Sequence, residues 1–162
     1  MSSINTINTA AFYRNNLTEV ILSNGIISIG ELAFAYNNIS NLVIGNNVQT
    51  IESFAFGYNN LIDVNISDNV SYLGESAFAY NNLKIVTLGS GITGFGADVF
   101  ESGISTYFDM TKGPNQLEQV YIRFPKALME LSTALFGWKD NSECDLWSGS
   151  VNDNPCITWV NG

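Results

Sequence analysis

Few residues in this chain could carry chemistry, and one common catalytic residue is missing. The 162 residues include no His, which excludes a Ser-His-Asp or Cys-His nucleophile, a His-ligated zinc and an imidazole pH switch. Paired carboxylates can hydrolyse glycosides or bind calcium, and the candidates here are Asp63 with Asp68 and Glu52 with Glu75. These residues occupy non-equivalent positions in the internal repeat, with no cleft-forming insertion beside them. We therefore expect a protein that is not an enzyme.

The two cysteines, Cys144 and Cys156, lie near the C-terminus and enclose a segment rich in turn formers. Their spacing is not C-x-x-C, which argues against a redox role, and two thiols without His leave half of a zinc ligand set unfilled. Such thiols either stay reduced in a cytosol or form a disulfide in an oxidising compartment. We expect the disulfide, which would stabilise the fold by about 3 kcal/mol in the chain-entropy estimate. No cofactor is expected.

Charge and hydropathy exclude further classes. Fifteen acidic and six basic residues give a net charge of −9 without a basic cluster, which argues against binding to nucleic acid or to an anionic membrane surface. No stretch approaches the roughly 20 consecutive apolar residues that a membrane span needs. The first residues have neither a basic segment nor an apolar segment of an export signal. Surface binding is therefore the expected activity.

An internal repeat with a period of 22 determines the fold. The dipeptide Ala-Phe recurs at 11–12, 33–34, 55–56 and 77–78, and Val-Phe follows at 99–100. Apolar columns with the same interval begin at Leu17, Val20, Leu22, Ile26 and Ile29. Each repeat reads L-x-x-V-x-I-x-x-x-V-x-x-I-x-x-x-A-F-x-x-N-N. Because a fixed period is typical of solenoids, we predict a β-rich stack of about five coils that bury one another's apolar faces.

Each coil is expected to contain one short strand, a second segment and a tight return. The V-x-I pair has the period-two spacing of a strand, and one repeat is too short for a strand plus a full helix. An extended or half-turn segment follows near residues 26–29. The Asn pair after Ala-Phe falls at the return turn, where Asn tolerates left-handed backbone and like amides can form ladders between coils. We expect the Asn pairs to be structural.

The repeat resembles a known family. The strings LTEVILSNGIISIGELAF and LKIVTLGSGITGFGADVF are similar to the BspA-like leucine-rich repeats of bacterial cell-surface proteins, and the resemblance covers residues 4 to about 100. That family often has Cys after Ala-Phe, where this 22-residue variant has Asn-Asn. The resemblance implies a right-handed leucine-rich repeat solenoid, an extracellular or cell-surface location, and a role in adhesion or protein recognition without enzymatic activity.

Two regions are expected, a solenoid over 1–124 and a C-terminal cap over 125–162. Leu117, Val120 and Ile122 restore the strand columns 12 residues later than the period requires, which indicates an insertion loop at 101–116. In the cap, Pro125 and Gly137 delimit a predicted helix over 126–136, and the Cys144–Cys156 loop follows.

The chain enters the repeat halfway through a coil, because Ile4 and Ile7 fall in the columns of Ile26 and Ile29. Terminal coils need a cap over their open apolar face. We expect a neighbouring subunit or an upstream segment to cover the edge at Ile4–Ile7.

Three features are candidate ligand-binding surfaces. They are the tyrosine stripe of Tyr36, Tyr58 and Tyr80, the outward strand positions Asp63 and Asn65, and the loop residues Tyr107 and Phe108. Tyrosine offers amphipathic contact area at low entropic cost. Each feature also has a structural interpretation, namely aromatic packing between coils, an ordinary strand face, or a loop that folds back over the last coil.

The sequence thus predicts a bacterial cell-surface recognition or adhesion module that binds a protein or a carbohydrate. The alternative is a structural subunit of a surface filament, because a disulfide-closed C-terminal loop is similar to that of type IV pilins and minor pilins. An enzyme is the third interpretation, and the composition barely supplies its catalytic groups.

Overall fold

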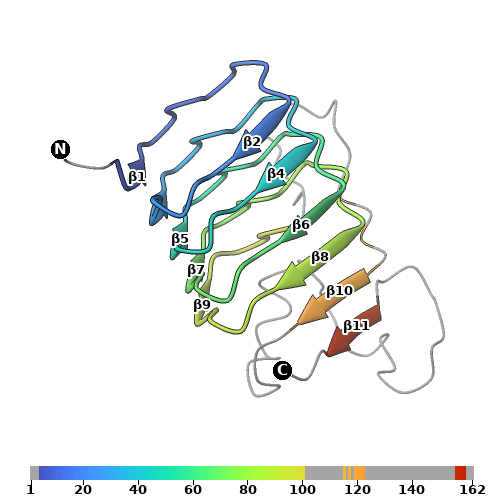
Figure 1. The fold of residues 1–162 in the computed structure, drawn as a ribbon. Coiled ribbons are helices and arrows are strands. Elements are labelled where there is room, and N and C mark those ends of the chain that lie inside the picture. Colours follow the sequence, from blue (N-terminus) through green and yellow to red (C-terminus); the bar gives the residue numbers. More distant parts are fainter. Residues whose placement is uncertain (1–3, 101–114, 116, 118, 123–155, 160–162) are drawn as a thin grey trace.

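The computed structural model describes residues 4–100, 115, 117, 119–122 and 156–159, and these residues form a parallel β-solenoid (Figure 1). Every strand pair among them is parallel. Neighbouring coils align residues one sequence period apart, as in the pairing of Ile29 with Ile51. The sequence period is therefore the step from one coil to the next, and the predicted leucine-rich repeat solenoid is confirmed.

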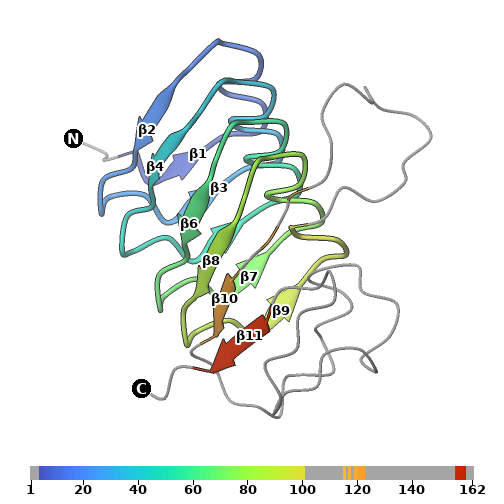
Figure 2. The same ribbon diagram turned by 90° about the vertical axis from the view of Figure 1, so that its right-hand side faces the viewer.

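Each complete coil contributes one short strand to each of two sides of the solenoid (Figure 2). The strands of the first side form one sheet, and those of the second side form a two-stranded and a four-stranded sheet, which we together call the second sheet. The first sheet contains β1 (Thr6–Ile7), β3 (Ser28–Ile29), β5 (Thr50–Ile51), β7 (Tyr72–Leu73) and β9 (Gly94–Phe95). On the second side lie the pair β2 (Glu19–Ile21) and β4 (Asn41–Val43), then β6 (Asp63–Asn65), β8 (Ile85–Leu88), β10 (Gln119–Ile122) and β11 (Cys156–Trp159). The strands of the first sheet occupy the position where the sequence predicted an extended or half-turn segment.

Strand β10 resumes the solenoid after the insertion. It pairs with β8 so that Val120 lies opposite Val86 and Ile122 opposite Leu88, which is a longer step along the sequence than the repeat period. The excess equals the insertion counted in the sequence, so the position of this strand is confirmed. This pairing keeps Val120 in the same inward position as Val86. A shift of the pairing by one residue would turn Val120 away from the core.

Strand β11 extends the same sheet and was not anticipated as part of it. It pairs with β10 in parallel, with Ile157 opposite Val120 and Trp159 opposite Ile122. The pair Ile157-x-Trp159 repeats the V-x-I spacing of the strand columns, which is the signal that could have placed it. The predicted helix over 126–136 and Cys144 lie outside the described residues.

The core is a set of stacked columns between the two sheets. Ile29, Ile51 and Leu73 form one fully buried column of the first sheet. Phe34, Phe56, Phe78 and Phe100 form another, and their successive rings stack with centroids 5.2 to 5.5 Å apart. Such pairs contribute about 0.5–1.5 kcal/mol each beyond the area that they bury. One coil alone could not bury these rings, so stability depends on neighbouring coils.

Candidate functional site

In the three pairs after the first, the first Asn is a buried structural residue that connects two coils, whereas Asn15 of the first pair is exposed. Asn37 Oδ1 accepts hydrogen bonds from the backbone N–H groups of Asn15 and Leu17, at 2.9 and 3.0 Å. Its Nδ2 donates to the carbonyl oxygens of Phe12 and Phe34, at 2.8 and 2.9 Å. Asn59 and Asn81 repeat this pattern one and two coils later. The structural role predicted for the pairs is confirmed for these residues.

The predicted backbone of the turn is wrong in one respect. Left-handed φ angles near 57° fall on Tyr36, Tyr58 and Tyr80, the residues before each pair, and among the paired asparagines only on Asn16. The amides of Asn37, Asn59 and Asn81 bond to backbone groups of their own coil and of neighbouring coils. The reason is geometric, because the first Asn must point its amide into the coil and the reversal therefore falls one residue earlier.

Asn115 holds the next position of this ladder. Its Oδ1 accepts a hydrogen bond from Leu83 N at 2.9 Å, and its Nδ2 donates to the carbonyl oxygens of Phe78 and Phe100. Asn115 falls within the insertion loop predicted over 101–116. The same long step that relates Val86 to Val120 also relates Asn81 to Asn115, and it could have identified the residue.

The tyrosine stripe is a stack of rings along one side of the coils. The rings of Tyr36 and Tyr58, and of Tyr58 and Tyr80, lie 4.1 Å apart between centroids and are nearly parallel. Tyr58 and Tyr80 are buried, while Tyr36 is half-buried beneath the Arg14 guanidinium, whose carbon lies 4.9 Å from the ring centroid. Burial raises the pKa of the Tyr58 phenol, and the adjacent phenols of Tyr36 and Tyr80 raise it further. This geometry gives the stripe a packing role.

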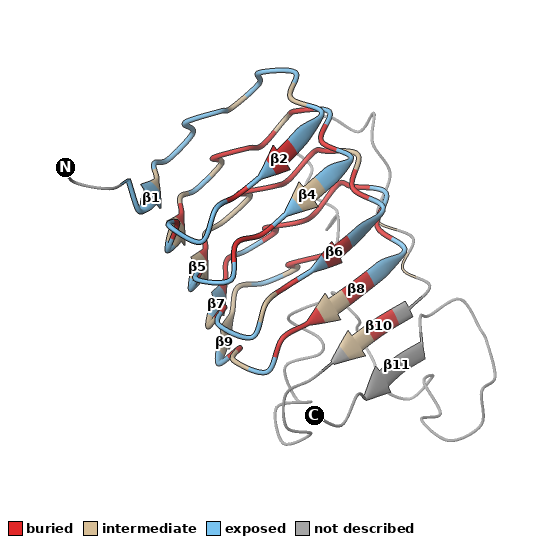
Figure 3. Cartoon of the chain, in the orientation of Figure 1, coloured by how far each residue is buried: buried red, intermediate tan, exposed pale blue. Residues whose placement is uncertain are grey.

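Asp63 and Asn65 are the exposed residues of β6, on either side of the buried Val64. Figure 3 shows buried and exposed positions alternating along this strand and along β2. Ile21 on β2 and Val43 on β4 are 66% and 48% exposed, and they lie opposite each other in register. Ile62 and Ile85, near Asp63, are 52% and 38% exposed. We refer to the outward side chains of β2, β4, β6 and β8, together with Ile62, as the strand face. Sequence reasoning noted this surface and did not single out its aliphatic residues as a site.

The remaining candidates cannot be placed on this surface. Tyr107, Phe108 and Cys144 lie outside the described residues, and Cys156 is known only as the first residue of β11. Their predicted roles stay predictions.

The described residues contain no group of three or more His, Cys, Asp or Glu side chains that could hold a metal ion. Within the same part of the chain, no helix is long and apolar enough to cross a membrane. The strand face combines exposed apolar area with polar side chains.

Comparison with known proteins agrees with this architecture. The family model described as "BspA type Leucine rich repeat region" matches residues 1–107 in six copies. Neither the curated proteins nor the solved structures gave a match. The comparisons give no support to the pilin resemblance of the C-terminal tail. With about two thirds of its length matched and the predicted stacked coils present, the chain belongs to the BspA-type leucine-rich repeat family.

Proposed function

We propose that this protein is a non-enzymatic recognition and adhesion module of a bacterial cell surface, and that it binds a protein through the strand face. Proteins with BspA-type repeats are typically bacterial and surface-associated, and their repeats serve as interaction modules. The family therefore supports the general class. The location, the adhesive role and the partner are the parts proposed here.

The observation that carries the proposal is the exposure of four aliphatic side chains on one side of the solenoid. Ile21, Val43, Ile62 and Ile85 are the exposed residues, and they come from four successive coils. Single exposed apolar residues are ordinary on protein surfaces, whereas a contiguous group marks an interaction site. A protein partner with an apolar patch would bury this group, which a sugar would bury less completely.

The polar residues of the strand face add a charge preference. Glu19 and Asp63 supply carboxylates, and Asn41 donates a hydrogen bond from its amide to the Glu19 carboxylate. The whole chain carries a net charge of −9. We therefore expect a partner whose contact surface is apolar at the centre and basic at the rim, because complementary charge speeds association and rejects wrong partners.

The test is a binding screen of immobilised chain against extracellular proteins of bacteria and hosts, followed by variants. Ile21→Asp and Val43→Asp each place a carboxylate among the exposed aliphatic side chains of the strand face, and each should weaken the binding of a true partner at least tenfold. Ile27→Asp is the matched control, because Ile27 is 38% exposed but belongs to the coil segment before β3. A partner that binds all three variants as tightly as the wild type would contradict the proposed surface.

One observation favours the alternative of a subunit in a larger surface assembly. In the first coil, Ile4 and Phe12 are 77% and 41% exposed, whereas the equivalent Ile26 and Phe34 are buried. A neighbouring subunit over the edge at Ile4–Ile7 would cover them. Sedimentation velocity should then show association that rises with concentration and is abolished by Phe12→Asp. A wild-type chain that stays monomeric at about 100 µM would count against this alternative.

A further inference from the structure

A second surface lies at the turns that lead from the second sheet to the first. It consists of two adjoining hollows of about 350 and 300 Å³, which share Asn69. The first hollow is lined by Asn24, Gly25, Ile27, Asn47, Gln49 and Asn69. The second is lined by Asn46, Asn65, Ser67, Asp68 and Asn69. We call this surface the amide groove, because most of its residues carry side-chain amides.

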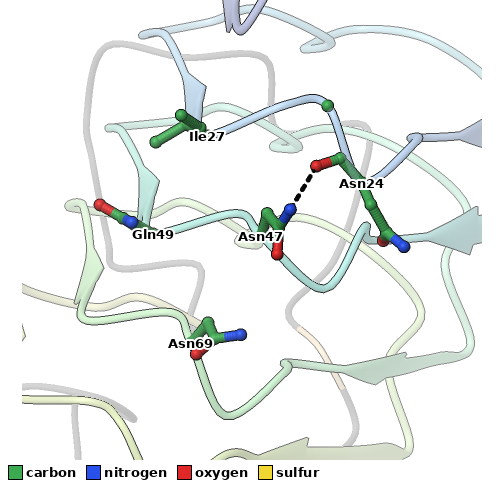
Figure 4. A pocket seen from close by; sticks show the side chains of 6 residues that line it. Asn24, Ile27, Asn47, Gln49 and Asn69 are labelled. Atoms are coloured by element: carbon green, nitrogen blue, oxygen red, sulfur yellow. Dashed lines mark hydrogen bonds between the residues drawn. The ribbon is translucent and has the colours of Figure 1, made fainter.

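Hydrogen bonds to the backbone of the neighbouring coil hold several of these amides by one end only. Asn24 Oδ1 accepts from Asn46 N at 2.8 Å, and Asn47 Nδ2 donates to Asn24 O at 2.7 Å (Figure 4). Asn69 Nδ2 donates to Asn46 O at 2.7 Å. Within the described part of the chain, no hydrogen bond reaches Asn24 Nδ2, the Oδ1 atoms of Asn47 and Asn69, or the Gln49 side chain. These atoms are donors and acceptors on residues that line the hollow, and the bonds at the other end of the side chain hold the three asparagines in place.

The turns themselves do not require these amides. The position of Asn47 and Asn69 is occupied by Gly25 in the coil before and by Gly91 in the coil after. Among the described residues, Gln49 bonds to the neighbouring coils through its backbone alone: its N–H donates to Ile27 O, and its carbonyl accepts from Ser71 and Tyr72. The amide groove therefore contains polar side chains beyond those that the fold needs.

The chemistry of the lining selects the ligand class. An amide offers both a donor and an acceptor, which matches a pair of neighbouring hydroxyl groups. Asp68 is the only ionisable residue of the lining, so the groove lacks the several carboxylates that a calcium site normally uses. Ile27, 38% exposed, provides an apolar contact for the carbon face of a sugar ring.

Equivalent amides recur at the coil spacing, which is about 4.8 Å between paired strands. Asn47 and Asn69 are one coil apart, as are Asn24 and Asn46. A chain of similar units laid along the stack would meet the same groups more than once. We propose that the amide groove binds a neutral oligosaccharide chain that runs across the coils from Asn24 to Asn69.

The test uses nuclear magnetic resonance of the full ¹⁵N-labelled chain, which reports the side-chain amide signals directly. The probes are the neutral hexasaccharides of cellulose, mannan, chitin and amylose, with hyaluronan and heparin hexasaccharides as charged comparisons. At least one neutral probe should shift the amide signals of Asn24 and Gln49 with a dissociation constant below about 1 mM. Asn47→Gly and Asn69→Gly, which carry the residue found at Gly25 and Gly91, should each weaken binding at least tenfold.

Two control variants separate this proposal from the protein-binding strand face. Asn38→Ala removes an exposed asparagine away from the groove, and Ile85→Asp disrupts the strand face outside the outward column that contains Asn65; neither should change glycan affinity. The proposal is overturned if no neutral probe binds, if only charged probes bind, or if both glycine variants bind like the wild type. Calcium alone shifting the same amide signals would overturn it in favour of a cation site.

Discussion

The buried asparagine ladder gives the sharpest prediction, and Asn59 is its central member. Asn59 is fully buried, and its Oδ1 accepts a hydrogen bond from Ile39 N at 3.0 Å. Its Nδ2 donates to the carbonyl oxygens of Phe34 and Phe56, at 3.0 and 3.1 Å. Replacement by Ala removes an acceptor and two donors in a place where water cannot substitute.

The expected loss of stability follows from the backbone groups that lose their hydrogen bond to Asn59. Ile39 N–H would lose its acceptor, which costs about 1–3 kcal/mol for a buried donor. The Phe34 and Phe56 carbonyls would each keep one donor, from Asn37 and Asn81, so each loss costs about 1 kcal/mol. Asn59→Ala should therefore lower the free energy of unfolding by about 4 kcal/mol, a large share of the 5–15 kcal/mol typical of a domain.

Urea unfolding at pH 7 measures this loss, and Asn38→Ala is the matched control. Asn38 is exposed, and its hydrogen bond within the described part of the chain runs from its backbone N–H to Leu17 O, which Ala retains. Its loss should be within about 0.5 kcal/mol. Equal losses in the two variants would refute the reasoning, because the freed backbone groups of the core would then have found other partners.

Asn59→Asp distinguishes hydrogen bonding from simple loss of volume. The carboxyl group keeps an acceptor for Ile39 N–H but places a second oxygen against two carbonyl oxygens. Burial raises the folded-state pKa of such a carboxyl above the unfolded value of about 3.9. The folded variant then binds the extra proton, so its stability should fall as pH rises above about 4, by up to 1.4 kcal/mol per pH unit. A pH dependence equal to that of the wild type would contradict this.

Two further predictions concern other residues. Tyr58 Oη is buried with no hydrogen-bond partner in the described part of the chain, so Tyr58→Phe should change stability at pH 7 by less than about 1 kcal/mol. Because the pKa of the Tyr58 phenol is raised on folding, wild-type stability should fall as pH rises above about 10 and the variant's should fall less; urea unfolding at pH 7 and pH 11 tests both. For Cys144 and Cys156, alkylation of the denatured, unreduced protein followed by intact-mass measurement should show no label, and two labels would contradict the disulfide.

The repeat made most of the fold predictable, because each inward side chain must pack against the coils on both sides and is therefore apolar in every repeat. For that reason the inward strand position is apolar in successive coils, as at Val20, Val64 and Val86. The same pattern locates Val120 after the insertion. The two-residue strands of the first sheet are too short to show periodicity, so the sequence indicated only an extended segment there. Strand β11 pairs across a long separation that no period spans.

The candidate binding surfaces were less predictable, because the position of a residue in the repeat does not say whether its side chain is buried or exposed. Tyr58 and Asp63 each stand at a definite repeat position, yet the structure buries the first between two rings and exposes the second beside Ile62. Tyr36 has the same left-handed backbone as Tyr58 but is only half-buried, so it is the rings on both sides of Tyr58 that bury it. The sequence left both a binding stripe and packing between coils open for these tyrosines, and the stacked rings favour packing.

The two proposed surfaces differ in one respect that bears on their ligands. Across the strand face, the equivalent residues Glu19, Asn41, Asp63 and Ile85 differ in every coil. A partner that matches such a surface must itself be non-repetitive, as a folded protein is. Along the amide groove, similar amides recur from coil to coil, and a periodic surface can match a periodic ligand in more than one register. Variation on the first surface and repetition on the second are therefore the physical grounds for assigning a protein to one and a glycan chain to the other.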